Sequence, residues 1–172
     1  KQAQTGGDKQ AKQIYEVLVK YKAALEQGLS ARTVTFDNKD DEKIARELFL
    51  LTAKPVLYVC NVDEASAATG NEYVERVREV AKQEGAEVLV IAAKIESEIA
   101  EFETYEERQM FLSEIGLEES GVARLIKSAY ALLRLKTYFT AGVQEVRAWT
   151  FHDGWKAPQG AGVIHTDFEK GF

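Results

Sequence analysis

Two short apolar runs in the middle of the chain give the clearest structural signal. Residues 56–60 (VLYVC) and residues 88–93 (VLVIAA) are uninterrupted by polar residues, and both are rich in β-branched side chains. Runs of this length and composition are typical of strands that are buried on both faces of a parallel sheet. We therefore expect two adjacent parallel strands at the centre of the fold.

The segment between these strands has the spacing of an amphipathic helix. Its expected apolar face consists of Tyr73, Val77, Val80 and Ala81, and Gly85 is placed to end it. A strand, a helix and a second strand in this order predict a right-handed βαβ unit.

Before residue 54 the spacing also predicts helices, but with a narrower apolar stripe, like the seam of a coiled coil. Apolar residues recur at alternating four- and three-residue steps from residue 10, and Gly28 supplies a stop signal. A similar seam follows Asp37 and Asn38, either of which can cap a second helix. Two seams joined by a short link predict an antiparallel helical hairpin.

After the βαβ unit, helical patterns give way to β-like ones. We expect helices over residues 96–115 and 118–136, separated by Gly116. Residues 146–151 (VRAWTF) alternate between apolar and polar, as a strand does, and residues 161–166 (AGVIHT) are interpreted as a further strand.

Composition adds a few exclusions. The 172 residues carry a formal net charge of −6, with 45% apolar and 29% charged residues, as in soluble globular proteins. This charge argues against a general nucleic-acid-coating surface and leaves a local basic patch open. Cys60, the single cysteine, is expected in the core. Because the sequence has neither a signal-peptide pattern nor an apolar run long enough to cross a bilayer, we expect a cytosolic protein without a membrane partner.

Polar residues follow both predicted strands. The sequence continues with Asn61-Val62-Asp63-Glu64 after the first strand and with Lys94 after the second. Carboxyl ends of parallel strands meet at one sheet edge, where open α/β sheets bind ligands. Asn and Asp are also common turn residues, and a lysine beside a strand is often an ordinary surface residue. The pattern is therefore compatible with two interpretations, a binding site and a simple turn.

Other candidates lie near the C-terminus. His165 and Asp167 are spaced to share one face of a strand, which would suit a metal ligand pair or a general base, but no third ligand is near in sequence and a structural histidine is the alternative. Trp149 and Trp155 are candidates for stacking on RNA bases or for filling a small β core.

Five stretches together resemble one family, the YchF/Obg-like ATPases of the translation-factor class of P-loop proteins. They are KPVLYVCNVDE (54–64), VIAAKIESEIAE (90–101), EERQMFL (106–112), YFTAGVQEVRAWTF (138–151) and KAPQGAGVIHTDFEKGF (156–172). The resemblance extends over nearly the whole chain, and the last two stretches are the most specific.

The resemblance implies an α/β protein with three parts. Residues 1–52 would be the C-terminal part of a coiled-coil helical arm, folded as an antiparallel hairpin. Residues 53–136 would be the C-terminal half of a P-loop nucleotide domain with a parallel sheet, and residues 137–172 the beginning of a β-grasp (TGS) domain. The chain contains no G-x-x-x-x-G-K-[ST] motif. The resemblance therefore places the phosphate loop, and the residues that hold Mg²⁺, upstream of these residues.

By the same resemblance, residues 61–64 correspond to the N-K-x-D motif of GTPases, in which the Asp carboxylate accepts two N–H bonds from guanine. Here Val62 and Glu64 stand at the second and fourth positions. The resulting N-x-x-E motif accompanies a preference for ATP over GTP in the family, because guanine donors without an acceptor are costly to bury. Asn61 would orient the loop, and backbone groups at Val62 would read the adenine edge.

The S-A-K loop of the family corresponds to Ala92-Ala93-Lys94, in which Ala92 replaces a residue that is usually serine or another small residue. This keeps a backbone contact possible and removes one hydroxyl. The predicted base-binding residues are therefore Asn61, Val62, Glu64, Ala92, Ala93 and Lys94. No residue of the chain is assigned to the chemical step or to a metal.

For the intact protein the resemblance implies slow hydrolysis of ATP, weaker use of GTP, and Mg²⁺ held by residues outside this chain. Its expected partners are the nucleotide and the large ribosomal subunit, with RNA contact possible through the TGS domain and the helical arm. The chain alone is predicted to be inactive. The alternative is a non-enzymatic module in which arm and TGS portion dock a ribosome or RNA and nucleotide plays no role.

Overall fold

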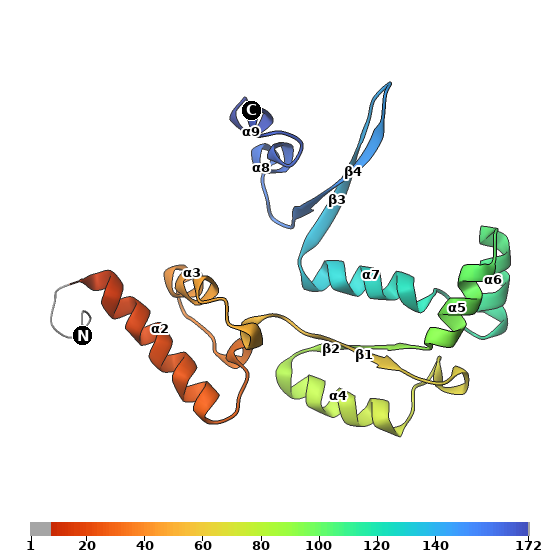
Figure 1. Ribbon diagram of the computed structural model, residues 1–172, viewed down its shortest axis with the longest axis horizontal. Coiled ribbons are helices and arrows are strands. Elements are labelled where there is room, and N and C mark those ends of the chain that lie inside the picture. Colours follow the sequence, from red (N-terminus) through yellow and green to blue (C-terminus); the bar gives the residue numbers. More distant parts are fainter. Residues whose placement is uncertain (1–7, 172) are drawn as a thin grey trace. The chain divides into compact units, whose positions relative to one another are not determined.

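The computed structural model describes residues 8–171 (Figure 1). The chain divides into two compact units, Lys1–Pro55 and Val56–Phe172. Most of the α-helices described begin at a residue whose side chain accepts a hydrogen bond from an amide of the first turn.

Within residues 8–55, the first unit contains two helices and two short 3₁₀ turns. Helix α2 (Lys9–Glu26) begins at Asp8, whose carboxylate accepts hydrogen bonds from the amides of two helical residues. Helix α3 (Lys39–Glu47) begins at Asn38, whose side chain accepts from the Asp41 amide at 2.8 Å. Asn38 is therefore the cap. The turns are η1 (Ala31–Thr33) and η2 (Leu51–Ala53), and the buried core consists of Val17, Tyr21, Ala31 and Ala45.

The contacts between α2 and α3 differ from those of the predicted antiparallel hairpin. Near the start of each helix, the Gln13 amide donates to the Asp41 carboxylate at 2.7 Å. Near their ends, Leu25 and Leu48 line the same apolar groove. The N-terminal ends of α2 and α3 therefore lie together, and so do their C-terminal ends. This is possible because the link over residues 27–38 is long enough to carry the chain back along α2.

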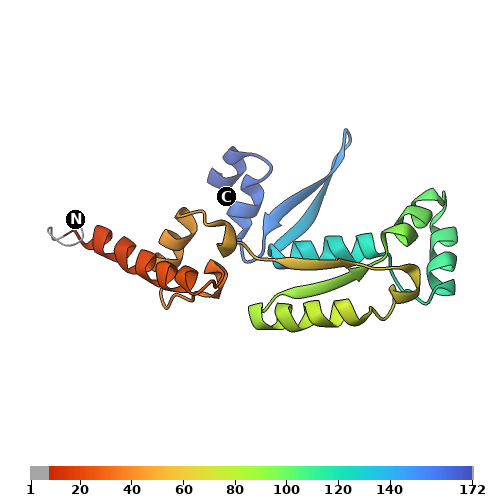
Figure 2. The same cartoon turned by 60° about the horizontal axis from the view of Figure 1, so that its bottom comes forward.

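The second unit contains the predicted βαβ arrangement. Strand β1 (Leu57–Asn61) pairs in parallel with β2 (Glu87–Ile91), and helix α4 (Glu72–Glu84) connects them. Figures 1 and 2 show α4 on one side of this sheet and α7 (Gly121–Leu132) on the other, and both helices contact both strands. The parallel pair and its connecting helix are confirmed.

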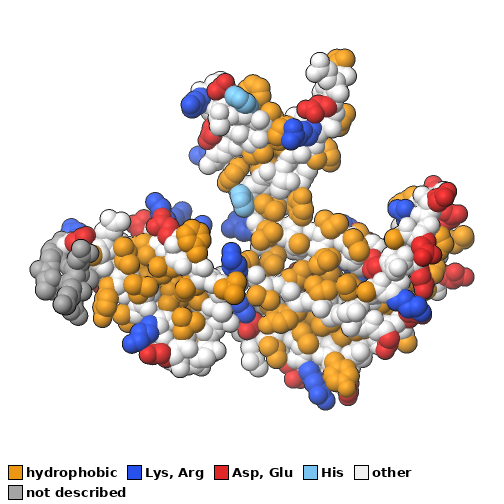
Figure 3. Space-filling model, viewed as in Figure 1, with side chains coloured by type: hydrophobic (Ala, Val, Ile, Leu, Met, Phe, Trp, Pro, Cys, Tyr) orange, Lys and Arg blue, Asp and Glu red, His pale blue; other side chains and the backbone are white. Residues whose placement is uncertain are grey.

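The two strands are not buried equally. Leu89 and Val90 of β2 are buried, whereas Val59 of β1 is 41% exposed and its neighbours in β1 are only partly covered. Figure 3 shows hydrophobic side chains at the surface of each unit. The prediction of burial on both faces therefore holds for β2 and not for β1, which has one neighbouring strand within residues 8–171.

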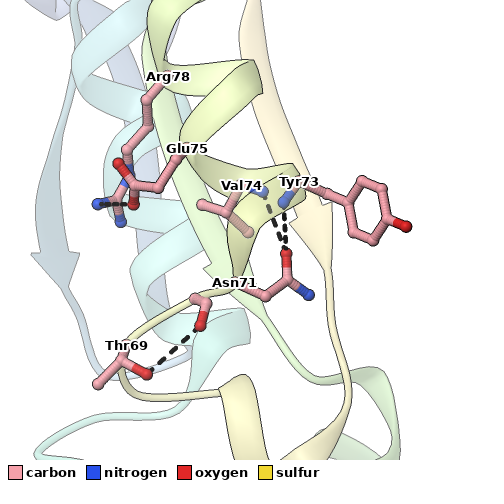
Figure 4. A network of polar contacts seen from close by, with 7 residues as sticks. Thr69, Asn71, Tyr73, Val74, Glu75 and Arg78 are labelled. Atoms are coloured by element: carbon pink, nitrogen blue, oxygen red, sulfur yellow. Dashed lines mark hydrogen bonds and ion pairs between the residues drawn. The ribbon is translucent and has the colours of Figure 1, made fainter.

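Helix α4 turns a different face to the sheet than the one predicted. Asn71 caps it by accepting from the amides of Tyr73 and Val74 at 3.1 Å, and Figure 4 shows the Tyr73 ring pointing away from the helix. Val74 and Ala81 are buried, whereas Tyr73 is 64% and Val80 50% exposed. The apolar spacing predicted the helix and, in Val77 and Ala81, part of its buried face. Tyr73 and Val80 were placed on that face incorrectly, because residues 74, 77 and 81 fit the same period.

The predicted helix over residues 96–115 is two helices, α5 (Ala93–Glu101) and α6 (Tyr105–Glu114). Thr104 starts α6 with a capping box: its hydroxyl accepts from the Glu107 amide, and the Glu107 carboxylate accepts from the Thr104 amide. This local signal outweighs the continuous apolar stripe. The following helix, α7, ends at Leu132 rather than residue 136, because Leu135 already belongs to a strand.

Strands β3 (Leu135–Ala141) and β4 (Val146–His152) form an antiparallel hairpin, followed by α8 (Ala157–Gly162) and α9 (Thr166–Lys170). The prediction of a strand over residues 161–166 is wrong. Pro158 fits the first turn of a helix, and the Gln159 side chain accepts from the Lys156 amide at 3.0 Å. These signals start a helix that runs into the predicted strand.

Candidate base-recognition site

The six predicted site residues lie together at the carboxyl ends of β1 and β2. Asn61, the last residue of β1, is opposite Ile91, the last residue of β2. The Asn61 side-chain oxygen accepts from the Ala93 amide at 3.0 Å, and the Val62 amide donates to the Ile91 carbonyl at 2.9 Å. Asn61 thus ties the loop after β1 to the segment Ala92–Lys94, which consists of the N-cap residue Ala92 and the first two residues of α5 and is called the loop after β2.

An apolar cluster lies beneath the two loops. Its buried members are Ala67, Ala92, Ile95, Ile99 and Leu112, and the partly buried Val62 packs against them. Ala92 is only 3% exposed, so its methyl group is part of this core. The whole residue is buried and its carbonyl accepts from the Glu96 amide at 3.1 Å, so position 92 packs under the site and offers a ligand almost no surface. The predicted backbone contact of Ala92 is thus not favoured, and apolar packing stands where a serine hydroxyl would be.

A short turn fixes the position of Glu64. The Asp63 carboxylate accepts from the Ser66 amide at 2.8 Å and starts the 3₁₀ turn η3 (Glu64–Ser66). Glu64 is the first residue of that turn, and its side chain is 48% exposed. The carboxylate is thus held at the end of β1 with access to solvent.

Glu64 and Lys94 form an ion pair between the two loops. Glu98, one turn further along α5, lies 4.0 Å from the same ammonium group. The hydrogen bond and the charge of Glu64 raise the pKa of Lys94, so the lysine stays protonated at neutral pH. The side chain of Lys94 is 74% exposed. The charges of the site are therefore paired with each other and open to a ligand.

This arrangement suits recognition of a flat, polar ring edge. It combines a carboxylate and an ammonium group that are paired with each other, loop backbone within the same patch, and an apolar floor beneath them. Within residues 8–171, no group of three or more His, Cys, Asp or Glu side chains is placed to hold a metal ion. In the same residues, no helix has the length and hydropathy to cross a membrane.

The C-terminal candidates have structural partners. The Nδ1 atom of His165 accepts from the Asp167 amide at 3.2 Å and caps α9, so this pair is a helix start and not a shared strand face. The Trp149 indole donates to the Thr140 hydroxyl at 2.9 Å, while the Arg147 guanidinium lies 4.3 Å from its ring centroid. Trp155 is 41% exposed.

Two residues that shape the site were not predicted as site residues. Asp63 acts through a local turn by accepting from a backbone amide, and an Asp directly after a predicted strand is a turn signal that sequence reasoning can use. Glu96 bonds to the amides of Gly121 and Val122, which are 25 and 26 residues away. No local pattern reveals contacts at that distance.

Comparison with known proteins gives consistent matches. The family model YchF-GTPase_C, described as a protein of unknown function (DUF933), matches residues 135–172. The chain is 56% identical over 167 residues to the ribosome-binding ATPase YchF of Bacillus subtilis, and 50% identical over 168 residues to the protein of the same name from Escherichia coli O157:H7. These matches cover 96% and 97% of the chain.

A solved structure agrees in fold. The Schizosaccharomyces pombe YchF GTPase superposes with a TM-score of 0.80 and 34% sequence identity over 95% of this chain and 43% of that one. The chain spans 45% of the length of the two bacterial relatives. The resemblance noted in the five sequence stretches is thus confirmed by sequence and by structure: over this span the chain is an α/β protein that belongs to the YchF family.

Proposed function

We propose that the loops after β1 and β2 form the base-recognition edge of an ATP site in a ribosome-associated P-loop ATPase. The observation that carries this proposal is the hydrogen bond from the Ala93 amide to the Asn61 side chain, which joins the two loops into one surface. Asn61 orients this surface, and the backbone at Val62, Ala93 and Lys94 contacts the base above the buried Ala92. Glu64 and Lys94 close one side of the surface.

The base preference follows from Glu64 and its partner. The extra methylene of Glu relative to Asp shifts the carboxylate, and the ion pair with Lys94 occupies it. A guanine edge would then leave donors without an acceptor, at a cost of about 1–3 kcal/mol for each buried donor. Adenine, which is read by backbone groups, does not incur this cost. The names of the relatives differ in the nucleotide that they state: the bacterial proteins are named ATPases, whereas the fission yeast protein is named a GTPase.

Equilibrium binding decides between the two bases. The sample is the product of the complete reading frame that encodes these residues, titrated with ATP and with GTP. We expect ATP to bind more tightly. The variant Glu64→Asp should raise the affinity for GTP relative to ATP by about tenfold, because a shorter carboxylate restores the guanine acceptor. Equal affinity for both nucleotides in the unmodified protein would refute the proposed preference.

Binding to the ribosome is proposed on the names of the bacterial relatives. Sedimentation of the same product with separated ribosomal subunits tests it, and we expect association with the large subunit that changes with the bound nucleotide. The helical arm (1–52) and the TGS portion (137–172) are the proposed contact regions, including any contact with RNA. Association with a ribosomal subunit that does not depend on the bound nucleotide would favour the non-enzymatic docking module.

The isolated 172 residues are expected to hydrolyse no measurable ATP. Catalysis of phosphoryl transfer depends on a phosphate loop that positions the nucleotide, and these 172 residues contain no G-x-x-x-x-G-K-[ST] motif. Robust Mg²⁺-dependent turnover by the purified 172-residue chain would contradict this part of the proposal.

A further inference from the structure

A second element besides β1 holds the loop Ala92–Lys94. Two residues after the loop, Glu96 accepts a hydrogen bond from the Gly121 amide at 2.6 Å with one carboxylate oxygen and from the Val122 amide at 3.1 Å with the other. These amides are the first two of α7 and have no acceptor inside the helix. A carboxylate at this end of a helix gains from hydrogen bonding and from the helix dipole.

The contact requires glycine at position 121. Gly121 is buried, and a Cβ atom there would lie 2.7 Å from Cγ2 of Ile91 and 2.8 Å from a carboxylate oxygen of Glu96. Ile91 immediately precedes the loop and Glu96 follows it. The start of α7 therefore contacts both flanks of the loop at a distance that a side chain would prevent.

Further along α7, Arg124 adds a third bond to the same segment. Its guanidinium donates to the carbonyl of Val90 in β2 at 2.8 Å. The contacts from α7 thus extend from the end of β2 to the first turn of α5.

Helix α7 does not depend on Glu96 in order to begin. Ser120 is its N-cap and accepts from the Ala123 amide at 3.2 Å. The half-buried Glu96 carboxylate is thus additional to the ordinary cap, and what it adds is a link between α7 and the loop of the candidate site.

We infer that Glu96, seated against Gly121, is a positioning residue for base recognition: it holds the backbone of Ala92–Lys94 against Asn61 so that the loop can read the base. This inference rests on the proposed function of the site. Glu96 would act through the loop and would not touch the nucleotide.

The test compares two ligands that share phosphates and differ in the base. In the product of the complete reading frame, Glu96→Gln keeps one acceptor oxygen and turns an amide N–H toward the second backbone donor. We expect the dissociation constant for ATP to rise about tenfold, while that for inorganic tripolyphosphate stays unchanged. Glu101→Gln removes the same charge from an exposed position of α5 and should change neither constant.

Gly121→Ala is an independent second variant, because it disturbs the same contact without changing the charge of Glu96. It should show the same selective loss of ATP affinity. Unchanged ATP binding in both variants would overturn the inference. An equal loss of ATP and tripolyphosphate, including loss through unfolding, would show a purely structural role and would overturn it as well. If the unmodified protein binds ATP no more tightly than tripolyphosphate, the proposed function itself fails.

Discussion

The two loops of the candidate site are neighbours, yet they are held in different ways. The loop after β1 contains its own polar side chains: Asn61 bonds to the opposite loop, and Asp63 bonds to the Ser66 amide. The loop after β2 begins with Ala92 and Ala93, and the start of α5 has no side-chain cap of its own. Its backbone is bonded by Asn61 from one element, and its flanks are held by α7 from another.

This difference shows how a loop of small residues can be both accessible and well placed. Small side chains leave the Ala93 backbone exposed to a planar ligand, while residues from other elements supply the hydrogen bonds that keep it in position. The first loop should therefore tolerate changes elsewhere in the fold, and the second should be sensitive to them. Four predictions test this contrast, beginning with the largest expected effect.

Gly121→Ala should destabilise the protein by about 1–2 kcal/mol. At this position alanine would ordinarily stabilise a helix by about 0.4–1 kcal/mol, but overpacking against Ile91 and Glu96 costs about 1–3 kcal/mol. Chemical denaturation of both proteins measures the change. Gly160→Ala in α8 is the matched control, since no atom lies within 4 Å of the added methyl group, and it should be neutral or slightly stabilising.

Asn61→Ala should lower the free energy of unfolding by about 1 kcal/mol and separate the two loops. It removes the acceptor of the Ala93 amide, which is exposed and regains part of the loss by binding water. Amide hydrogen exchange at Ala93 should become faster. Asn61→Asp keeps an acceptor at the same place, so fast exchange in that variant too would show that the bond does not hold the loop.

Asp63→Ala should cost about 0.5 kcal/mol and disturb only the first loop. The lost bond caps a 3₁₀ turn of three residues, so the effect falls at the low end of that for helix caps. Exchange at the Ser66 amide should accelerate while exchange at Ala93 stays the same. Asp63→Asn retains the acceptor and serves as the control. A simultaneous change at Ala93 would contradict the separate support of the two loops.

The smallest expected effect is a pH dependence of stability at the capping box of α6. This cap, like the turn at Asp63, is formed by residues close together in sequence. Hydrogen bonds from the backbone and hydroxyl of Thr104 lower the pKa of Glu107. Because the folded pKa lies below the unfolded one, the contribution of Glu107 to stability is present above the ordinary glutamate pKa and is lost as pH falls through the lowered value.

An NMR titration of the Glu107 carboxyl measures this shift. In Thr104→Ala, which lacks the hydroxyl donor, the pKa should move back toward that of an ordinary glutamate. An unchanged pKa in this variant would show that the Thr104 hydroxyl does not contribute to the shift, and that backbone hydrogen bonds cause it alone.

The sequence predicted those parts of the molecule that local patterns control. Two apolar runs predicted the parallel strands, and polar residues after them predicted which loops meet, since register and topology bring Asn61 opposite Ile91. The N-x-x-E motif and the A-A-K loop came from family resemblance. Their role in base binding stays a prediction, as do the boundaries of the arm, nucleotide and TGS regions.

Prediction failed where two local signals competed or where contacts were distant. In AGVIHT (161–166) an apolar run suggested a strand, but Pro158 and Gln159 upstream start a helix. The capping box at Thr104 divides a helix that its apolar stripe made look continuous. The contact between Glu96 and Gly121 joins elements that no sequence period relates.

The central claim is that both loops recognise the base of a nucleotide. Hydrogen exchange of the complete gene product with ATP, compared with inorganic tripolyphosphate, tests it directly. We predict that ATP slows exchange in segments 61–64 and 92–94 and that tripolyphosphate does not, because only ATP carries a base. Equal protection by both ligands, or no protection in either segment, would contradict the account.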